Sequence, residues 1–133
     1  MAVLGVIALA LYWYSQSWLL MSVYPDAPTV RLSVVASGVN KTVTLNDEQA
    51  DRLRGSLYSG PPPIIVHSCY VPHHFFRFYD KAGKEVGEVE VCFCCGGGRE
   101  APSLMTPGRR LDIDEDEVKA IVRELGLPVD VGC

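Results

Sequence analysis

The chain has 133 residues, of which 48% are hydrophobic, and a formal net charge of −4 at pH 7. This length allows one small domain besides an N-terminal apolar stretch. The mild negative charge provides no basic patch, so nucleic acid is excluded as an expected partner.

An uncharged, mostly apolar stretch opens the chain at residues 2–24. Because a helix rises ~1.5 Å per residue, about 20 such residues can span a hydrocarbon core ~30 Å thick. Residues 1–24 are therefore predicted to be a transmembrane anchor or a signal-like helix. Aromatic rings favour membrane interfaces, and a glutamine in lipid favours a partner helix. The candidate anchor residues are Tyr12, Trp13, Gln16 and Trp18.

Two other interpretations of this stretch remain open. Ala8-Leu9-Ala10 has the small-x-small pattern of an export-signal cleavage site, and an all-round apolar helix can also be a buried core helix. Arg31 and Lys41 follow the stretch and weakly favour a cytoplasmic domain. The density of cysteines favours an oxidising compartment instead. We expect a single-pass membrane protein with an extracytoplasmic (periplasmic) domain, and the bilayer and other membrane or envelope proteins as partners.

A linker with two prolines occupies residues 25–28, and residues 29–133 form the predicted cysteine-containing domain. Thr29–Ala36 alternates apolar and polar residues, which predicts a strand. Ser37–Asn40 is predicted to turn the chain.

A helix start follows at Asn46, which can form a capping box with Gln49. Ala50, Leu53 and Leu57 continue at helical spacing, and the Ser-Gly-Pro-Pro-Pro run at 59–63 ends the helix. The β-branched run Ile64-Ile65-Val66 predicts a short buried strand.

A β-hairpin is predicted from strands at 74–79 and 85–93, joined by a turn at 80–83. Apolar and polar faces agree on both strands when Arg77 lies opposite Glu88. This register also pairs Phe76 with Val89 and His74 with Val91, and it places His73 across from Cys92.

The chain is predicted to be irregular from 96 to 110 and to form a final helix with Asp114 as its N-cap and Glu117 at the third position. Gly126 and Pro128 end that helix. Its apolar stripe consists of Val118, Ile121, Val122 and Leu125. The predicted fold class is α+β: a small antiparallel sheet with two helices on one face, preceded by the N-terminal hydrophobic (transmembrane) helix.

Thiols flank the hairpin, because Cys69 precedes it and Cys92 and Cys95 close it. One hypothesis is a structural disulfide from Cys69 to Cys92 or Cys95, which would close a loop of roughly 25 residues and add about 3 kcal/mol of stability. Five cysteines cannot all pair within one chain, and Cys133 is the expected unpaired one.

Two alternatives use the same sulfur atoms. A structural zinc site would take its ligands from Cys69, His73, His74, Cys92 and Cys95, since Cys-x-x-Cys-Gly is typical of zinc knuckles. A thiol-disulfide oxidoreductase would use Cys92 and Cys95, although redox Cys-x-x-Cys motifs usually begin a helix and this one runs into glycines.

Several of these residues resemble an uncharacterised family of small bacterial exported proteins and lipoproteins. The matching residues are Leu45 with Gln49, Cys69 with Pro72 and His74, Phe78 to Asp80 with Gly83, Cys92-Phe93 with Cys95, and Leu125-Gly126-Leu127-Pro128. The resemblance covers roughly residues 42–129 and implies an envelope location, with no assigned chemistry. Cys94 and Cys133 are additional thiols, and the N-terminal stretch has no cysteine for lipid attachment.

No catalytic residue is assigned, and no cofactor is expected apart from zinc in that alternative. The expected function is that of a membrane-tethered interaction module or an accessory subunit of an envelope complex, without enzymatic activity.

Overall fold

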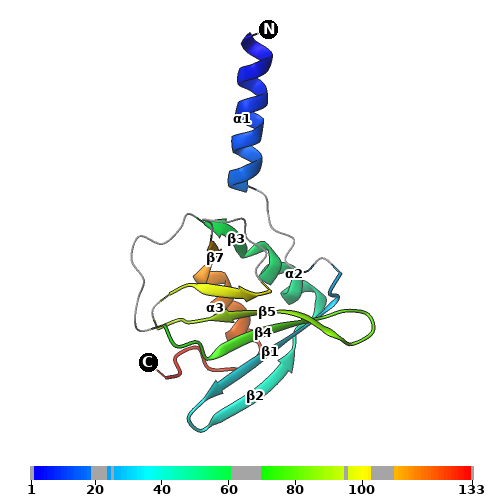
Figure 1. Cartoon of the computed structure of the whole chain (residues 1–133). Coiled ribbons are helices and arrows are strands. Elements are labelled where there is room, and N and C mark those ends of the chain that lie inside the picture. The colour runs from blue at the N-terminus through cyan, green and yellow to red at the C-terminus, as the bar shows by residue number, and fades with distance from the viewer. Residues whose placement is uncertain are drawn as a thin grey trace.

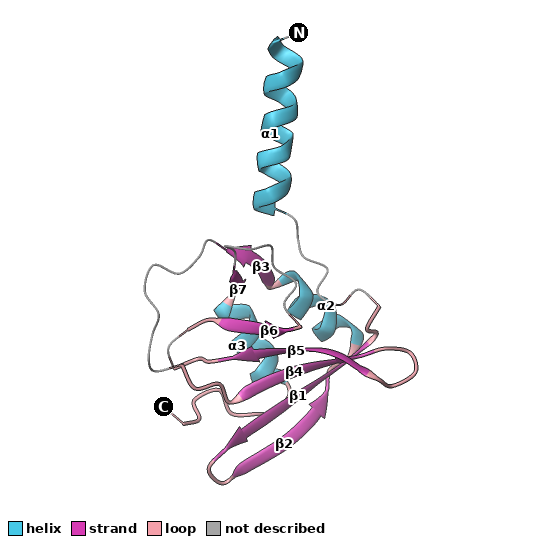
Figure 2. Ribbon diagram, viewed as in Figure 1, coloured by secondary structure: helices cyan, strands magenta, loops and turns pink. Residues whose placement is uncertain are grey.

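The computed structural model describes residues 2–18, 24, 26–60, 70–94, 96–102 and 110–132, with side chains of the first helix described for residues 3–12. Within this part of the chain there are three helices and seven strands (Figures 1 and 2). Their order is α1 (Ala2–Trp18), β1 (Thr29–Ala36), β2 (Val39–Thr44), α2 (Asp47–Gly55), β3 (Leu57–Gly60), β4 (His74–Tyr79), β5 (Glu85–Val91), β6 (Gly98–Ala101), β7 (Arg110–Ile113) and α3 (Glu115–Glu124).

The main sheet has five antiparallel strands in the order β2-β1-β4-β5-β6, and β3 pairs with β7 in a separate two-stranded sheet. Both α2 and α3 lie behind the main sheet in Figure 2. The α+β prediction, with an antiparallel sheet and two helices on one face, is confirmed.

The predicted hairpin register is also confirmed. Arg77 pairs with Glu88, and the flanking pairs Phe76–Val89 and His74–Val91 follow as expected. The Asp80 carboxylate accepts hydrogen bonds from the backbone N–H groups of Ala82 and Lys84, both at 2.9 Å. These bonds close the turn, which is the local reason why the strands meet in this register.

One face of the main sheet forms the core, because alternate residues of its three central strands point toward the helices. Phe76 and Phe78 are the largest fully buried side chains. The other buried residues of β1, β4 and β5 in this core are Val30, Leu32, Val34, Val89 and Val91, and the helices contribute Ala50, Leu53, Val118, Ile121 and Val122.

Helix α2 starts as predicted, since Asn46 and Gln49 form a complete capping box. It ends at Gly55, however, and the predicted helical residue Leu57 begins β3. Leu57 is buried in this strand, and β3 finds its partner more than 50 residues away in β7. A buried leucine at this spacing fits either a helix or a strand, so the sequence around Leu57 does not decide between them. The strand depends on pairing with the distant β7.

Four further predictions concern local structure. Val39 lies in β2 rather than in a turn, and the segment expected to be irregular contains β6. Both are edge strands of the main sheet, and their pairing depends on β1 and β5 rather than on their own residues. The predicted strand at 64–66 lies outside the described residues. Helix α3 has the predicted N-cap, because the Asp114 carboxylate accepts a hydrogen bond from the N–H of Glu117.

Helix α1 projects away from the sheet (Figure 1) and carries no charged residue. It has 17 residues, and no helix in the described part of the chain is long and apolar enough to cross a membrane. Its described large side chains are all exposed, namely Val3, Leu4, Val6, Ile7, Leu9, Leu11 and Tyr12. The buried-core-helix interpretation is therefore wrong for residues 3–12. The side chains of Trp13, Gln16 and Trp18 lie outside the described part.

Tyr24 attaches the segment after α1 to the core. Its ring packs against Phe78 with the ring centroids 4.9 Å apart, and its hydroxyl donates to the carbonyl oxygen of Pro102 at 3.3 Å. A side chain at Gly87 would collide with it, because a Cβ there would lie 2.0 Å from the Tyr24 Cζ. Burial raises the pKa of Tyr24, so its hydroxyl stays protonated. The absence of a side chain at Gly87 makes this docking possible.

We predict that Gly87→Ala destabilises the domain by about 1–3 kcal/mol, because the new methyl group displaces the Tyr24 ring. Thermal unfolding of the full chain in mild detergent measures this loss. Gly55→Ala is the matched control, since a Cβ there meets nothing within 4 Å. In a Tyr24→Ala background the Gly87→Ala cost should largely vanish, and equal costs in both backgrounds would contradict the contact.

Candidate functional site

Two imidazoles and two thiols of the chain lie at the end of the β4–β5 hairpin where β4 starts and β5 stops. The described ones are His73, His74, Cys92 and Cys94. The backbone of residues 127–132, here called the C-terminal strap, passes the same end of the sheet. Of the predicted neighbours, the structure describes His73, His74 and Cys92 at this end of the sheet, and it adds a segment that the sequence did not place there.

His74 is buried and already has a hydrogen-bond partner. It is 1% exposed, and its Nε2 donates to the carbonyl oxygen of Pro128 in the strap at 2.8 Å. Its ring meets the Phe93 ring edge-on, with centroids 4.7 Å apart. Burial lowers the pKa of His74, so the ring is held neutral with its proton on Nε2. His74 is therefore a structural residue that holds the strap, and it is not presented to a metal.

His73 faces the other way and is also engaged. Its Nδ1 donates to the carbonyl oxygen of Val35 at 2.9 Å, and its own carbonyl oxygen accepts from the Val35 N–H at 2.9 Å. The Nε2 side of the ring lies against Gly132, where a Cβ would come within 2.1 Å of it. Both ring nitrogens are thus covered by backbone, which disfavours the predicted ligand role.

Cys92 is a free thiol and is 1% exposed. Its N–H donates to the carbonyl oxygen of Gly97 at 3.1 Å, so the chain turns back into β6 directly after it. Tyr70 lies close by, and its hydroxyl donates to the Glu90 carbonyl oxygen at 3.4 Å while Arg99 stacks on its ring at 4.2 Å. Burial raises the pKa of Tyr70, the negative charge of Glu90 raises it further, and the positive charge of Arg99 partly opposes this shift. Tyr70 and Arg99 were not expected at this site.

Cys94 is disulfide-bonded, and its partner lies outside the described residues. Its Sγ lies 3.9 Å from the carbonyl oxygen of Val131 in the strap. Cys69, Cys95 and Cys133 all lie outside the described part of the chain. The predicted Cys69–Cys92 bond is therefore wrong, since Cys92 is free, whereas a Cys69–Cys95 bond stays a prediction.

The described geometry gives little support to the other two hypotheses, the structural zinc site and the thiol-disulfide oxidoreductase. No group of three metal-ligating side chains occurs among the described residues, and both predicted histidine ligands are occupied. The zinc alternative stays a prediction for the residues outside this part. For the oxidoreductase alternative, Cys92 directly follows strand β5 and is buried, so it has neither the helix N-terminus nor the exposure that activates a redox thiol.

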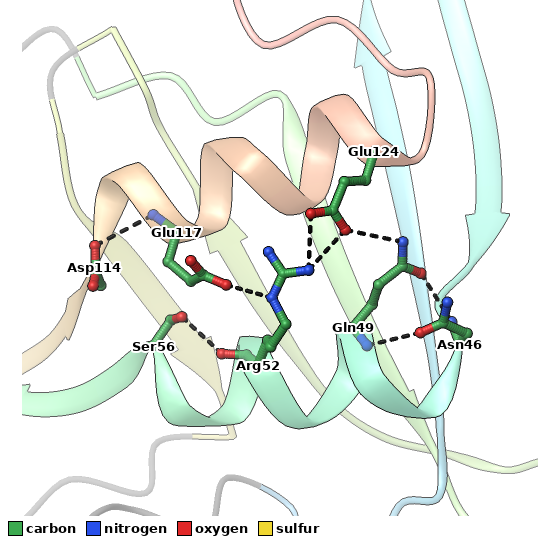
Figure 3. A network of polar contacts seen from close by, with 7 residues as sticks. All are labelled: Asn46, Gln49, Arg52, Ser56, Asp114, Glu117 and Glu124. Atoms are coloured by element: carbon green, nitrogen blue, oxygen red, sulfur yellow. Dashed lines mark hydrogen bonds and ion pairs between the residues drawn. The ribbon is translucent and has the colours of Figure 1, made fainter.

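A second polar cluster joins the two core helices (Figure 3). Arg52 of α2 donates from Nε to Glu117 at 2.5 Å and from Nη1 to both Glu124 oxygens at 2.8 Å, and Gln49 adds a bond to Glu124 at 3.4 Å. The Asp114 N–H also donates to the Ser56 carbonyl oxygen at 2.8 Å. The β3–β7 ladder brings the end of α2 to the start of α3, and the cluster joins the two helices through ion pairs.

The open face of the main sheet carries arginine–aromatic stacks. Arg31 lies 4.8 Å from the Tyr79 ring centroid, and Arg77 lies 5.7 Å from that of Phe75. Arg77 is also paired with Glu88 at 2.8 Å. This face is thus polar and internally charge-paired rather than basic.

A shallow cavity of about 760 Å³ lies at the other end of the hairpin, by the Asp80 turn. Its charged lining includes Asp26, Asp51, Arg54 and Asp80. Arg54 is already bonded to the Ala27 carbonyl oxygen and to Asp51, and it stacks over Phe78. The cavity contains no cysteine or histidine and is separate from the sulfur cluster.

No family model, no curated protein and no solved structure matches this chain. The resemblance noted in the sequence therefore stays a prediction, and function must be inferred from the geometry.

We predict that stability falls as the pH drops from 7 to 5, by at most about 1.4 kcal/mol per pH unit, because of His74. The pKa of His74 in the folded chain lies below the ordinary value of 6.5. At pH values between the two, His74 is protonated in the unfolded chain but not in the folded chain. His74→Gln can still donate to Pro128 but does not titrate, so its melting temperature should depend less on pH. His73→Gln is the control and should keep the wild-type slope. Equal slopes in wild type and His74→Gln would contradict the assignment.

We predict that Arg52→Gln raises the pKa of Glu124 toward the ordinary glutamate value, because hydrogen bonds from Arg52 are the main cause of its lowered pKa. Because the folded pKa is depressed, the stabilisation is present at neutral pH and is lost as the pH falls below the ordinary glutamate value and through the folded pKa. NMR titration of Glu124 measures the shift. Arg123→Gln, an exposed change in the same helix, should leave the Glu124 pKa where it is; an equal rise there would point to a general charge effect.

Proposed function

We propose that this chain is a membrane-tethered extracytoplasmic α+β domain that acts as an interaction module or accessory subunit of an envelope complex, without catalysis of its own. The observation that carries the proposal is helix α1. It has no charged residue, and its described apolar side chains are exposed on every side, with Val3 and Leu4 about 70% exposed. Water is a poor environment for such a helix, so a lipid or protein environment is required.

Lipid is the environment that we favour for α1. The uncharged stretch continues in sequence to Tyr24, beyond the end of the described helix, and its total length suits a bilayer. A small polar domain follows immediately, and Tyr24 docks it onto its own core. Because the folded domain begins so soon after α1, this arrangement suits a short membrane tether better than an N-terminal tail that binds and releases.

The disulfide at Cys94 supports the extracytoplasmic side. Disulfides persist outside the cytoplasm and are rare within it. The engaged histidines and the buried Cys92 support a binding role rather than catalysis, because they form no exposed cluster of reactive groups.

We predict that the wild-type chain stays in the membrane fraction after alkaline carbonate washing. The double variant Val6→Asp with Leu9→Asp should move to the soluble fraction, since each aspartate costs about 2.5–3.5 kcal/mol at the centre of a spanning helix. Val35→Asp, at an exposed valine of β1, is the control and should remain with the membrane. A soluble wild type, or a double variant retained like wild type, would rule out anchoring by α1.

Size-exclusion chromatography tests the subunit role separately from the membrane anchor. Protein purified from native membranes in mild detergent should elute on size-exclusion chromatography as an assembly larger than the monomer in its micelle. A lone monomer from membranes that retain the chain would contradict the subunit role while leaving the anchor intact.

A further inference from the structure

The two-stranded sheet of β3 and β7 lies at the foot of helix α1. Cα atoms of α1 come within 8 Å of Cα atoms of β3, and Figures 1 and 2 show β3 and β7 on the side of the domain that faces the helix. A helix of 17 residues is about 25 Å long, which is close to the ~30 Å thickness of a hydrocarbon core. With α1 in lipid, the end of the helix and the strand beside it therefore lie at the level of the headgroups.

One face of this small sheet points away from the core. Leu57, Leu111 and Ile113 are buried, so the residues that alternate with them along the two strands face outward. We call this side the outer face of β3–β7. Its side chains are Tyr58, Arg110 and Asp112.

The three side chains of the outer face form one group. Tyr58 is 43% exposed, and Arg110 Nη2 lies 3.5 Å from a carboxylate oxygen of Asp112. Burial raises the pKa of Tyr58, the negative charge of Asp112 raises it further, and Arg110 partly opposes this shift. The phenol therefore stays protonated and can donate a hydrogen bond.

This chemistry suits the surface of a phospholipid bilayer. A tyrosine has an apolar ring and a polar hydroxyl, and such side chains gather at the level of the headgroups. A guanidinium binds phosphate through two parallel hydrogen bonds. The side chain of Arg110 is 46% exposed, so a phosphate can reach it beside Asp112.

The size of the outer face also favours lipid over a protein partner. Two strands of four residues cover roughly 14 Å by 10 Å, far less than the ~800 Å² that each partner buries in a stable protein interface. A bilayer needs no such area, because α1 already holds the domain beside it.

We propose that the outer face of β3–β7 is the surface with which the domain rests on the membrane. Tyr58 inserts its ring between phospholipid headgroups, and Arg110 binds a lipid phosphate. This inference rests on the proposed anchoring by α1 and adds the orientation of the domain. In that orientation the main sheet stands on the bilayer with β6 as its nearest strand and β2 as its farthest (Figure 2).

Photo-crosslinking of the full chain tests the contact. The protein is reconstituted in vesicles of phosphatidylcholine and phosphatidylglycerol that contain a fluorescent phosphatidylcholine. Tyr58→p-benzoylphenylalanine should crosslink to lipid on irradiation. Val35→p-benzoylphenylalanine is the matched control, because Val35 is also 43% exposed but belongs to β1, and it should acquire little label. Labelling at position 58 no greater than at position 35, or a crosslink from position 58 to a second copy of the chain, would overturn the proposal.

A third crosslinking position separates this contact from the anchor itself. Leu9→p-benzoylphenylalanine, in α1, should be labelled by lipid. If position 9 is labelled and position 58 is not, the contact of the outer face fails while the anchor stands. If position 9 is not labelled, the anchor fails, and the orientation proposed here fails with it.

The phosphate contact is tested by charge removal. In the chain that carries the crosslinker at position 58, Arg110→Gln should lower lipid labelling by up to about fivefold, the contribution of one arginine near an anionic surface. Arg31→Gln, which removes an exposed arginine of β1, is the control and should leave the labelling unchanged. Unaltered labelling in Arg110→Gln, or an equal loss in Arg31→Gln, would overturn the role of Arg110.

Discussion

The position of β4 between β1 and β5 is the constraint on which the other features depend. Its side chains alternate strictly, so His74, Phe76 and Phe78 enter the core while the residues between them face outward. A slip of one residue would move both phenylalanines and the histidine to the open face. The Asp80 turn holds β4 against β5, and the ladder with β1 holds it from the other side.

Burying the polar ring of His74 costs folding free energy, and a hydrogen bond to the C-terminal strap offsets this cost. A buried polar ring without a partner is destabilising, and the Pro128 carbonyl supplies the acceptor that it needs. The strap in turn covers the end of the sheet and leaves neither histidine available as a ligand. The same contacts that stabilise the fold therefore remove the imidazoles from the chemistry that their sequence spacing suggests.

Sequence reasoning succeeded where the signals are local. The helix N-caps, the hairpin turn and the alternation of β4 and β5 are each contained within a few residues, and all correspond to observed elements. It failed at Leu57, because helical and extended backbones both bury a leucine there and the choice depends on β7, more than 50 residues away. For the same reason the acceptor of His74 and the stack of Arg99 on Tyr70 could not be foreseen. Cysteine spacing could not decide which of the thiols are bonded, and the predicted closeness of Cys69 to Cys92 and Cys95 stays a prediction because Cys69 and Cys95 lie outside the described residues.

The docking of Tyr24 limits how far the domain can lie from helix α1. Between the last residue of α1, Trp18, and the clamped Tyr24 there are six peptide steps, which extend to at most about 20 Å. If α1 lies in lipid, as proposed, this short connection keeps the domain close to the membrane surface. It can then reach only what lies in the first layer above the headgroups, so any binding partner must present its own contact region at that height.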